Sequence, residues 1–331
     1  MTEKYVLVVG GAGYIGSHTN LYLHEAGYRT VVFDNLVYGH KSAVFCGELV
    51  TGDLASADDL EAVFTQYDIA CVMHFAAYAY VGESVQDPQK YYENNLAGTL
   101  NLLAAMRRHE VSDIVFSSTC ASYGVPVALP ITESHPQQPI NPYGASKMMV
   151  ERILQDYGRA YGLRSVVLRY FNAAGADPQC RIGEDHAPET HLIPLVLQAA
   201  ARGTPVRVFG SDYDTPDGTC IRDYIHVSDL AAAHKLAMDY LVNTGQSAIF
   251  NLGNEQGFSV KEVIKLAETV TGRPVHVNYC DRRPGDPAEL VASADLARTA
   301  LGWRPAYNTL SAILETAWAW TKRMEEASKP L

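Results

Sequence analysis

The chain has 331 residues, of which 47% are hydrophobic, and it carries a formal net charge of −11. This is enough apolar sequence for one large core or two coupled domains, while the acidic balance and the lack of a long basic run argue against nucleic acid or an anionic membrane surface as a partner. The six cysteines form no CxxC pair, which favours reduced thiols in a cytosolic protein over a disulfide framework.

The first predicted strand, YVLVV at 5–9, is apolar throughout, as a strand buried on both faces should be. It begins so near Met1 that no room is left for a signal peptide. The segment GGAGYIGSH that follows, at 10–18, has glycines at positions 10, 13 and 16 and opens a predicted helix that stops at Gly27. Such glycines allow a tight turn, a close approach of backbone to a pyrophosphate and packing of helix on strand. The helix N-terminus adds N–H groups for the phosphates, so the loop predicts a dinucleotide site.

The second predicted strand, at 29–33, is followed by Asp34, which lies 18 residues after Gly16. A carboxylate in this place can accept hydrogen bonds from both ribose hydroxyls of NAD and would repel the 2′-phosphate of NADP. No arginine is present in the next two residues, Asn35 and Leu36. The cofactor is therefore predicted to be NAD.

The third predicted strand, at 48–53, ends in GDL at 52–54, where Asp53 is expected to meet the adenine. Asp53 is also a candidate N-cap for the helix predicted at 57–67. A fourth strand, at 69–77, ends in HFAA on the cofactor edge of such a sheet. The weakly polar run that it begins contains His74 and is too short to span a bilayer.

A long helical pattern at 91–109 precedes a fifth strand at 113–119, and the stretch INPYGASKMMVERIL at 140–154 reads as a helix from Gly144 on. Tyr143 and Lys147 are four residues apart and so share one helix face. The spacing alone suits a catalytic pair and, equally, a tyrosine ring stacked on a lysine stem. A sixth strand is predicted at 164–172.

Strands that alternate with helices in this way predict an α/β protein with right-handed βαβ units, a Rossmann-type doubly wound parallel sheet. After Gly175 a loop rich in Gly, Pro and charge, at 175–191, leads to shorter mixed elements. We therefore expect an NAD-binding domain at 1–174 and a smaller mixed α/β C-terminal substrate domain at 175–331. The chain is expected to return to the first domain near 222–250, because DYIHVSDLAAA at 223–233 resembles a strand–turn–helix unit of the main sheet.

Taken together, the motifs resemble the extended short-chain dehydrogenase/reductase family and, within it, the sugar-nucleotide 4-epimerases, over essentially the whole chain. The resemblance rests on GGAGYIGSH, DNL, GDL, HFAAYAYVGESV, YYENNLAGT, FSSTCASYG, NPYGASK, LRYFNAAGADP, DGTCIRDYIHVSDLA and RRPGDP. It implies a cytoplasmic homodimer, paired through the helices at 91–109 and 143–161, that interconverts UDP-glucose and UDP-galactose through a 4-keto sugar.

The resemblance also assigns the site. Tyr143 is the implied acid/base, Lys147 tunes Tyr143 and holds the nicotinamide ribose, and Thr119 bridges to the sugar hydroxyl. The implied NAD-binding residues are Gly10, Gly13, Tyr14, Ile15, Gly16, Asp34, Asn35, Asp53, Leu54, Phe75, Ala76, Ala79, Asn94, Tyr143, Lys147 and Phe171. The implied UDP-sugar residues are Thr119, Asn172, His191, Leu192, Arg207, Val208, Phe209, Arg222, Arg283, Asp286 and Leu290.

Three positions depart from the pattern of the family. Ala79 stands where well-studied members carry a lysine, His191 where many have asparagine, and Leu290 where tyrosine or a small residue is usual. Arg222 and Arg283, expected to clamp phosphate, are also compatible with surface salt bridges.

Two further alternatives concern the chemistry. Dehydratases of the family carry an Asp–Glu pair directly after the threonine, whereas here Cys120 and Ala121 follow Thr119, which favours an epimerase. A UDP-xylose/UDP-arabinose 4-epimerase and a non-catalytic NAD-sensing protein remain open. The stretch EDHAPETH at 184–191 could bind a metal, but its spacing fits no standard zinc motif, and no metal is predicted.

Overall fold

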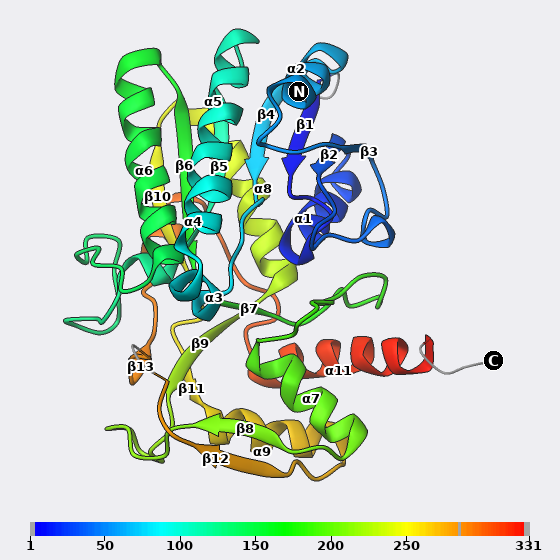
Figure 1. The fold of residues 1–331 in the computed structure, drawn as a ribbon, viewed down its shortest axis with the longest axis vertical. Helices are drawn as coiled ribbons and strands as arrows, with labels where there is room; N and C mark the ends of the chain where they lie inside the picture. Colours follow the sequence, from blue (N-terminus) through cyan, green and yellow to red (C-terminus); the bar gives the residue numbers. More distant parts are fainter. Residues whose placement is uncertain (1–3, 284–285, 328–331) are drawn as a thin grey trace.

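Seven parallel strands form the central sheet of the computed structural model, which describes residues 4–283 and 286–327 (Figure 1). The strands are β1 (Tyr5–Val9), β2 (Arg29–Asp34), β3 (Glu48–Thr51), β4 (Ile69–His74), β5 (Asp113–Thr119), β6 (Arg164–Tyr170) and β10 (Ala248–Leu252). Their order is β10-β6-β5-β4-β1-β2-β3, so the direction of winding reverses between β1 and β4. Ligands of such sheets bind at this reversal, beyond the carboxyl ends of the strands.

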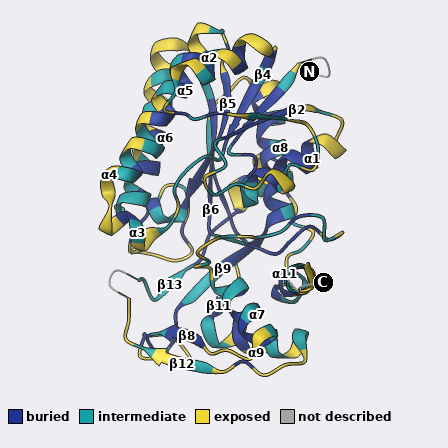
Figure 2. Ribbon diagram, turned by 45° about the vertical axis from the view of Figure 1, so that its right-hand side comes forward, coloured by how far each residue is buried: buried dark blue, intermediate teal, exposed yellow. Residues whose placement is uncertain are grey.

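Helices cover both faces of the sheet, and the strands between them are buried (Figure 2). One face packs against α1 (Tyr14–Glu25) and α8 (Val227–Thr244), the other against α2 (Ala57–Gln66), α5 (Gly98–Arg108) and α6 (Pro142–Tyr161). Alternate residues of β1 belong to the two apolar clusters, Val6 and Val8 to one, Leu7 and Val9 to the other. Burial on both faces is the reason that YVLVV is apolar without alternation.

A smaller lobe lies below the carboxyl ends of the sheet in Figure 1. Its four-stranded sheet consists of β9 (Ile221–His226) with β7 (Asn172–Ala174), β11 (Gly257–Ser259) and β13 (Glu289–Leu290). A second, two-stranded sheet pairs β8 (Val206–Phe209) with β12 (Val277–Cys280). Around them pack α7 (Leu192–Arg202), α9 (Val260–Thr271) and α11 (Leu310–Ala327), while α10 (Asp295–Ala300) contacts β10 of the large sheet.

The predicted fold class is confirmed, and three predicted elements need correction. The sixth strand breaks at Phe171: β6 lies in the large sheet, whereas β7 pairs with β9. The assignment of β9 to the main sheet was wrong, because its partners are β7, β11 and β13; the return to the large lobe is made by α8, which packs on α1, and by β10.

The third correction concerns the helix predicted at 91–109. It consists of α4 (Pro88–Tyr91), a stretch of wider π-type turns at Tyr92–Ala97 and then α5. Within the wide turns, Asn95 exchanges hydrogen bonds with the backbone of Tyr78 and also donates to Ser146 Oγ at 3.2 Å. The neighbouring Asn94 thereby reaches the cavity described below. A local widening of this kind is common at functional sites.

The structure bears on two features expected from composition, the state of the cysteines and the membrane-spanning segments. None of the six cysteines, all in the described part of the chain, forms a disulfide. Among the helices of the described residues, none has the length and apolar character needed to cross a membrane.

Candidate active site

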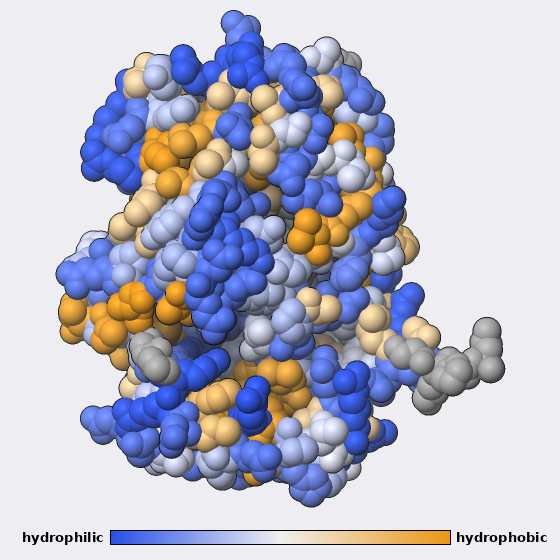
Figure 3. Space-filling model, in the orientation of Figure 1, coloured by the Kyte–Doolittle hydropathy of each residue, from blue (hydrophilic) through white to orange (hydrophobic). Residues whose placement is uncertain are grey.

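A cavity of about 1050 Å³ opens between the two lobes, at the carboxyl ends of the large sheet. Figure 3 shows the surface hollowed between the lobes, with hydrophilic and hydrophobic side chains along its border. Except for Asp53, every residue predicted for the cofactor, the substrate or catalysis lines this cavity. Residues drawn from many separate parts of the sequence are thus brought to one place.

The glycine loop between β1 and α1 has no room for side chains. Gly10 has φ +80°, and a Cβ there would lie 2.4 Å from the backbone nitrogen of Ala76. A Cβ on Gly16 would lie 2.3 Å from the carbonyl oxygen of Gly10. Gly13, the N-cap residue of α1, provides no side-chain cap, so N–H groups of the first helical turn are left for an anion. This cradle fits the pyrophosphate of a dinucleotide.

Asp34 is held rigidly at the end of β2. Its Oδ2 accepts a hydrogen bond from Ala12 N at 2.9 Å, and its Oδ1 accepts one from Leu36 N at 2.8 Å. Burial raises the pKa of the Asp34 carboxyl, while these two backbone bonds act to lower it. The fixed carboxylate retains lone pairs for the hydroxyls of a ribose.

Of the two roles predicted for Asp53, the N-cap of α2 is wrong, and the contact with adenine stays a prediction. The chain turns after β3, and Asp53 lines a separate, smaller cavity of about 410 Å³. Its carboxylate accepts hydrogen bonds from Asn35 Nδ2 at 2.9 Å and from Ala55 N at 2.8 Å. The N-cap of α2 is Ser56, whose hydroxyl accepts from Asp59 N. Asp53 therefore positions Asn35, which does line the large cavity.

Thr119, Tyr143 and Lys147 meet where β5 ends and α6 begins. Asn141 caps α6 by accepting a hydrogen bond from Gly144 N at 2.8 Å, and Pro142 occupies the first turn. A Cβ on Gly144 would lie 2.3 Å from the carbonyl oxygen of Ala121. This glycine, whose role the sequence analysis missed, lets the start of α6 approach the chain that follows Thr119.

Burial sets the protonation of the pair. It raises the pKa of Tyr143 to about 12, and contact with the Thr119 hydroxyl acts in the opposite direction. It lowers the pKa of Lys147 to about 7, against the influence of Glu151. Lys147 Nζ donates to the carbonyl oxygen of Ser117 at 2.8 Å. In the chain alone, burial outweighs the contact with Thr119 that favours the phenolate, and the tuning of Tyr143 by Lys147 stays a prediction for the complex with NAD.

The substrate lobe contributes an arginine pair. Arg222 of β9 is well buried and Arg283 is largely exposed, and both form ion pairs with Asp286, the second at 3.1 Å. Residues 284–285 of the RRPGDP motif lie outside the described residues. The guanidinium of Arg283 also lies 4.9 Å from the ring centroid of Phe209 on β8. Asp286, one of the predicted UDP-sugar residues, therefore pairs with the two arginines that border the same cavity.

Other predicted substrate residues lie on the wall between the lobes. Asn172 Nδ2 donates to the carbonyl oxygen of Asp223 at 2.9 Å. Leu290, on β13, packs against a small apolar cluster that contains Phe171 and Tyr123. His191 directly precedes α7 and lines the cavity. Its Nδ1 also forms an ion pair with Glu184 Oε1, at 2.6 Å.

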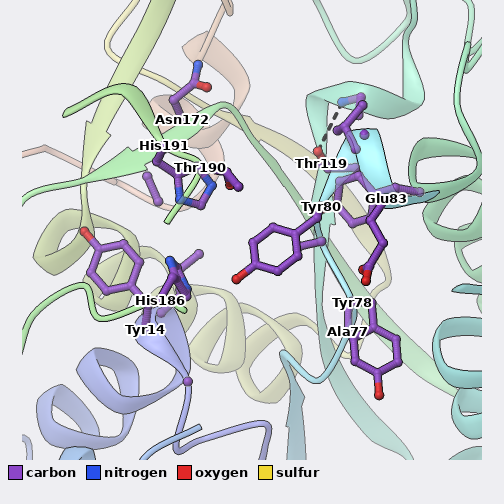
Figure 4. Close-up of a pocket in the computed structure, with 18 of the residues that line it drawn as sticks. Tyr14, Ala77, Tyr78, Tyr80, Glu83, Thr119, Asn172, His186, Thr190 and His191 are labelled. Atoms are coloured by element: carbon purple, nitrogen blue, oxygen red, sulfur yellow. Dashed lines mark hydrogen bonds between the residues drawn. The ribbon is translucent and has the colours of Figure 1, made fainter. Parts of the chain in front are cut away.

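Figure 4 shows the cavity at the level of its aromatic and imidazole side chains. Tyr80 projects into the middle of the space, with His186 and Tyr14 on one side and Thr119 on the other. Neither Tyr80 nor His186 was among the predicted binding residues. Tyr80 belongs to the stretch HFAAYAYVGESV and His186 to EDHAPETH, but the residue spacing within these stretches predicts no binding role for either side chain.

Comparison with known proteins gives consistent matches. The profile of the NAD dependent epimerase/dehydratase family matches residues 6–253. The UDP-glucose 4-epimerase of Halalkalibacterium halodurans is 54% identical over 318 residues, which are 96% of this chain and 95% of that protein. The residues matched by the profile include the glycine loop, Thr119, Tyr143 and Lys147.

Solved structures of UDP-glucose 4-epimerases are similar to this chain over nearly its whole length. The UDP-glucose 4-epimerase of Brucella ovis in complex with NAD superposes with a TM-score of 0.92 at 52% identity, over 95% of this chain and 97% of that one. The UDP-glucose 4-epimerase of Bifidobacterium longum in complex with NAD⁺ and UDP gives a TM-score of 0.92 at 39% identity, over 96% and 98%. The likeness therefore extends over both lobes and the cavity between them.

Proposed function

The chain belongs to the NAD dependent epimerase/dehydratase family, and from this we propose that it is an NAD-dependent 4-epimerase that interconverts UDP-glucose and UDP-galactose. The observation that carries the proposal is the meeting of Thr119, Tyr143 and Lys147 in one cavity with the glycine loop and the arginine pair. The first three residues suit proton transfer at a sugar hydroxyl, and the last two features suit a dinucleotide and a nucleoside diphosphate.

The residues of the cradle fit NAD, as the glycine loop and the fixed Asp34 carboxylate show. The loop would hold the pyrophosphate, Asp34 the adenosine ribose and Lys147 the nicotinamide ribose. Bound NAD supplies the redox chemistry at C4 of the sugar. The protein's own contribution is to hold both molecules still and to exclude water from the reacting atoms.

Tyr143 would take the proton of the 4-hydroxyl and return it to the same oxygen after the sugar has turned, with Thr119 as the bridge to that oxygen. A phenol whose pKa is raised to about 12 is a poor base at neutral pH. A positive charge brought close to the ring favours the phenolate, and so the base is expected to be strongest in the assembled complex.

The chain also supports epimerisation over elimination. After Thr119 come Cys120 and Ala121, and neither carries a carboxylate that could act on the 4-keto sugar. Burial raises the pKa of the Cys120 thiol to about 12, so this thiol stays protonated. The 4-keto sugar is therefore left to turn within the cavity and to be reduced on its other face, while Arg222 and Arg283 anchor the diphosphate end.

Product identification tests the function. The purified chain, without added NAD, should convert UDP-glucose to UDP-galactose and back to the same equilibrium mixture. Conversion of UDP-xylose to UDP-arabinose alone would favour the pentose enzyme. Binding of NAD without conversion of any UDP-sugar would favour the non-catalytic NAD-sensing protein.

NAD should remain bound through purification, because the reaction regenerates it and the glycine loop and Asp34 hold it at two points. Denaturation of the purified chain should release close to one NAD(H) per chain, measured enzymatically in the supernatant. Recovery of NADP would contradict the role of Asp34, and cofactor-free protein that needs a large excess of NAD would contradict tight retention.

Leu290→Tyr should narrow substrate choice. Leu290 packs beside Phe171 at the cavity wall, so a larger ring there takes space from the sugar. We expect efficient use of UDP-glucose and UDP-galactose by the natural chain and weak use of N-acetylated or pentose analogues. The variant should lower kcat/KM for the N-acetylated sugar, relative to the plain sugar, by about 10–200-fold.

The matched control is Leu296→Tyr, the same change at an exposed position of α10. This control should leave the ratio of kcat/KM values unchanged. An unchanged ratio in Leu290→Tyr would show that Leu290 does not border the sugar.

We further propose a cytoplasmic homodimer paired through α5 and α6, whose surfaces expose Leu100 and Met149. Light scattering at several protein concentrations measures the oligomeric state.

We also propose a division into two domains at residue 174. Residues 1–174 would bind NAD and residues 175–331 the UDP-sugar, and α8 and β10 would return to the NAD-binding domain.

A further inference from the structure

Four side chains from one loop converge beside the cavity. Glu184, His186, Glu189 and His191 each offer an atom of a kind that ligates metals, and these atoms all lie within 4.8 Å of one another. The linear spacing of EDHAPETH predicted no metal, because it matches no standard zinc motif. The folded loop nevertheless brings two imidazoles and two carboxylates together.

The distances between the four side chains suit a shared metal ion. His186 Nδ1 lies 3.2 Å from Glu184 Oε1 and 3.7 Å from Glu189 Oε2, while His191 Nδ1 lies 2.6 Å from Glu184 Oε1 and 3.4 Å from Glu189 Oε1. Zinc–ligand bonds of about 2.0–2.2 Å in a tetrahedron place neighbouring ligand atoms about 3.3–3.6 Å apart. Three of the four contacts are close to that separation, and the 2.6 Å contact between His191 and Glu184 would lengthen when a cation binds.

A second observation points to an ion. The Glu184 side chain is only 5% exposed and that of Glu189 only 7%. Glu184 Oε1 lies 3.2 Å from His186 Nδ1 and 2.6 Å from His191 Nδ1, yet neither contact has the alignment of a hydrogen bond. Buried polar atoms are nearly always hydrogen-bonded, so these exceptions need a cause. Ligand atoms that lie close together without hydrogen-bond alignment are arranged as they would be around a bound cation.

We propose that Glu184, His186, Glu189 and His191 bind a divalent transition-metal cation, with Zn²⁺ as the best match to two nitrogen and two oxygen ligands. The competing arrangement is a network of ion pairs without metal. Binding of a cation would displace the protons that such a network needs.

The site has a definite place in the fold. His186 lies edge-on to the Tyr14 ring, with 6.1 Å between centroids, and Tyr14 OH donates to the carbonyl oxygen of Gly175 at 2.6 Å. His186 and His191 both line the cavity, and His191 directly precedes α7 (Figure 4). A cation here would tie the loop to the substrate lobe. It would also add positive charge beside the glycine loop, and only this last role rests on the proposed function.

The loop has other anchors, so variants of the cluster should fold. Trp320 Nε1 of α11 donates to the carbonyl oxygen of Glu184 at 2.9 Å. The His40 ring contacts the carbonyl oxygen of Asp185 at 3.0 Å. A Cβ on Gly183 would lie 2.4 Å from the Trp320 ring, so the backbone is packed closely against α11.

Metal binding is measured on the full chain after treatment with a chelator and desalting. Addition of ZnCl₂ should load one Zn²⁺ per chain, as counted by elemental analysis, and competition with a chromophoric chelator gives the Kd. Glu184→Gln and His186→Ala each remove one ligand and should weaken binding by more than the 10–100-fold that loss of an outer-shell partner costs. His276→Ala, at an exposed histidine far from the loop, should bind as the natural chain does.

The proposal is overturned if the natural chain retains no stoichiometric Zn²⁺ after desalting, or if Glu184→Gln and His276→Ala bind it equally. Circular dichroism and NAD content report whether each variant is folded, and Glu189→Gln replaces any variant that is not. Because bound metal is counted directly, the two proposals can be tested separately. Metal binding without epimerase turnover would support the metal site and contradict the proposed function. Turnover without metal binding would support the function and contradict the metal site.

Discussion

Tyr143→Phe is expected to lower epimerase turnover by about 10²–10⁴-fold, the usual contribution of a positioned acid/base. The phenyl ring still fills the space at the start of α6, so the affinity for UDP-sugar should stay close to that of the natural chain. The loss should fall on kcat, since the hydroxyl acts on the proton and not on the diphosphate that anchors the substrate.

Steady-state kinetics and UDP-sugar titration by calorimetry measure the two quantities. Tyr161→Phe removes the same hydroxyl from the exposed end of the same helix and should change neither. Near-normal turnover of Tyr143→Phe would disprove the assigned role, and a parallel loss of affinity would point to a misfolded site instead.

Glu151→Gln is expected to destabilise the chain by about 3–5 kcal/mol, because it leaves a buried arginine without its counter-charge. Glu151 and Arg169 are 2% and 4% exposed, and two guanidinium nitrogens of Arg169 contact the carboxylate. Gln137 Nε2 also donates to Glu151 Oε2 at 3.0 Å, and Ser118 Oγ donates to Oε1. Ser118 directly precedes Thr119, so this network supports the end of β5.

Asp156→Asn removes one negative charge from the same helix, where Asp156 pairs with the exposed Arg152 and Arg159. Surface pairs contribute about 0–1 kcal/mol, and this variant should be nearly neutral. Urea unfolding of the two variants at equal NAD content gives the comparison, because bound cofactor stabilises the folded state. A loss below 1 kcal/mol in Glu151→Gln would show that the buried pair is relaxed by water or by a rearrangement.

The fold was predictable where local pattern decides it. Strands buried on both faces and helices with one apolar face are recognisable from a short window, and β1, β5 and α6 begin and end close to where they were predicted. The sheet to which a strand belongs is not a local property. Residues 164–172 read as one strand, but the chain leaves the large sheet at Phe171, and β9 resembles a main-sheet strand while pairing in the other lobe.

The candidate site was predictable where spacing along one element sets the geometry. The glycine loop and the Tyr143–Lys147 pair are of this kind. The N-cap role of Asp53 was wrong because two polar residues precede α2, and it is Ser56 that caps the helix while Asp53 accepts a hydrogen bond from Asn35. The raised pKa of Tyr143 in the chain alone could not be predicted, because burial depends on the whole fold. The cluster at Glu184 was invisible because a loop's closure is not encoded in regular spacing.

A nascent chain released from the ribosome only as far as Ala174 carries β1 to β6 but lacks β10 and α8. One edge of β6 then exposes unpaired backbone groups, and the apolar face that Leu230, Ala237 and Leu241 of α8 later cover is open to water. Both are the features that chaperones recognise in unfinished sheets. The large sheet is thus completed only after translation has passed Leu252, and by then β7, α7, β8 and β9 of the smaller lobe have been synthesised. Folding of the two lobes is therefore coupled in time, because part of the smaller lobe is synthesised before the large sheet is complete.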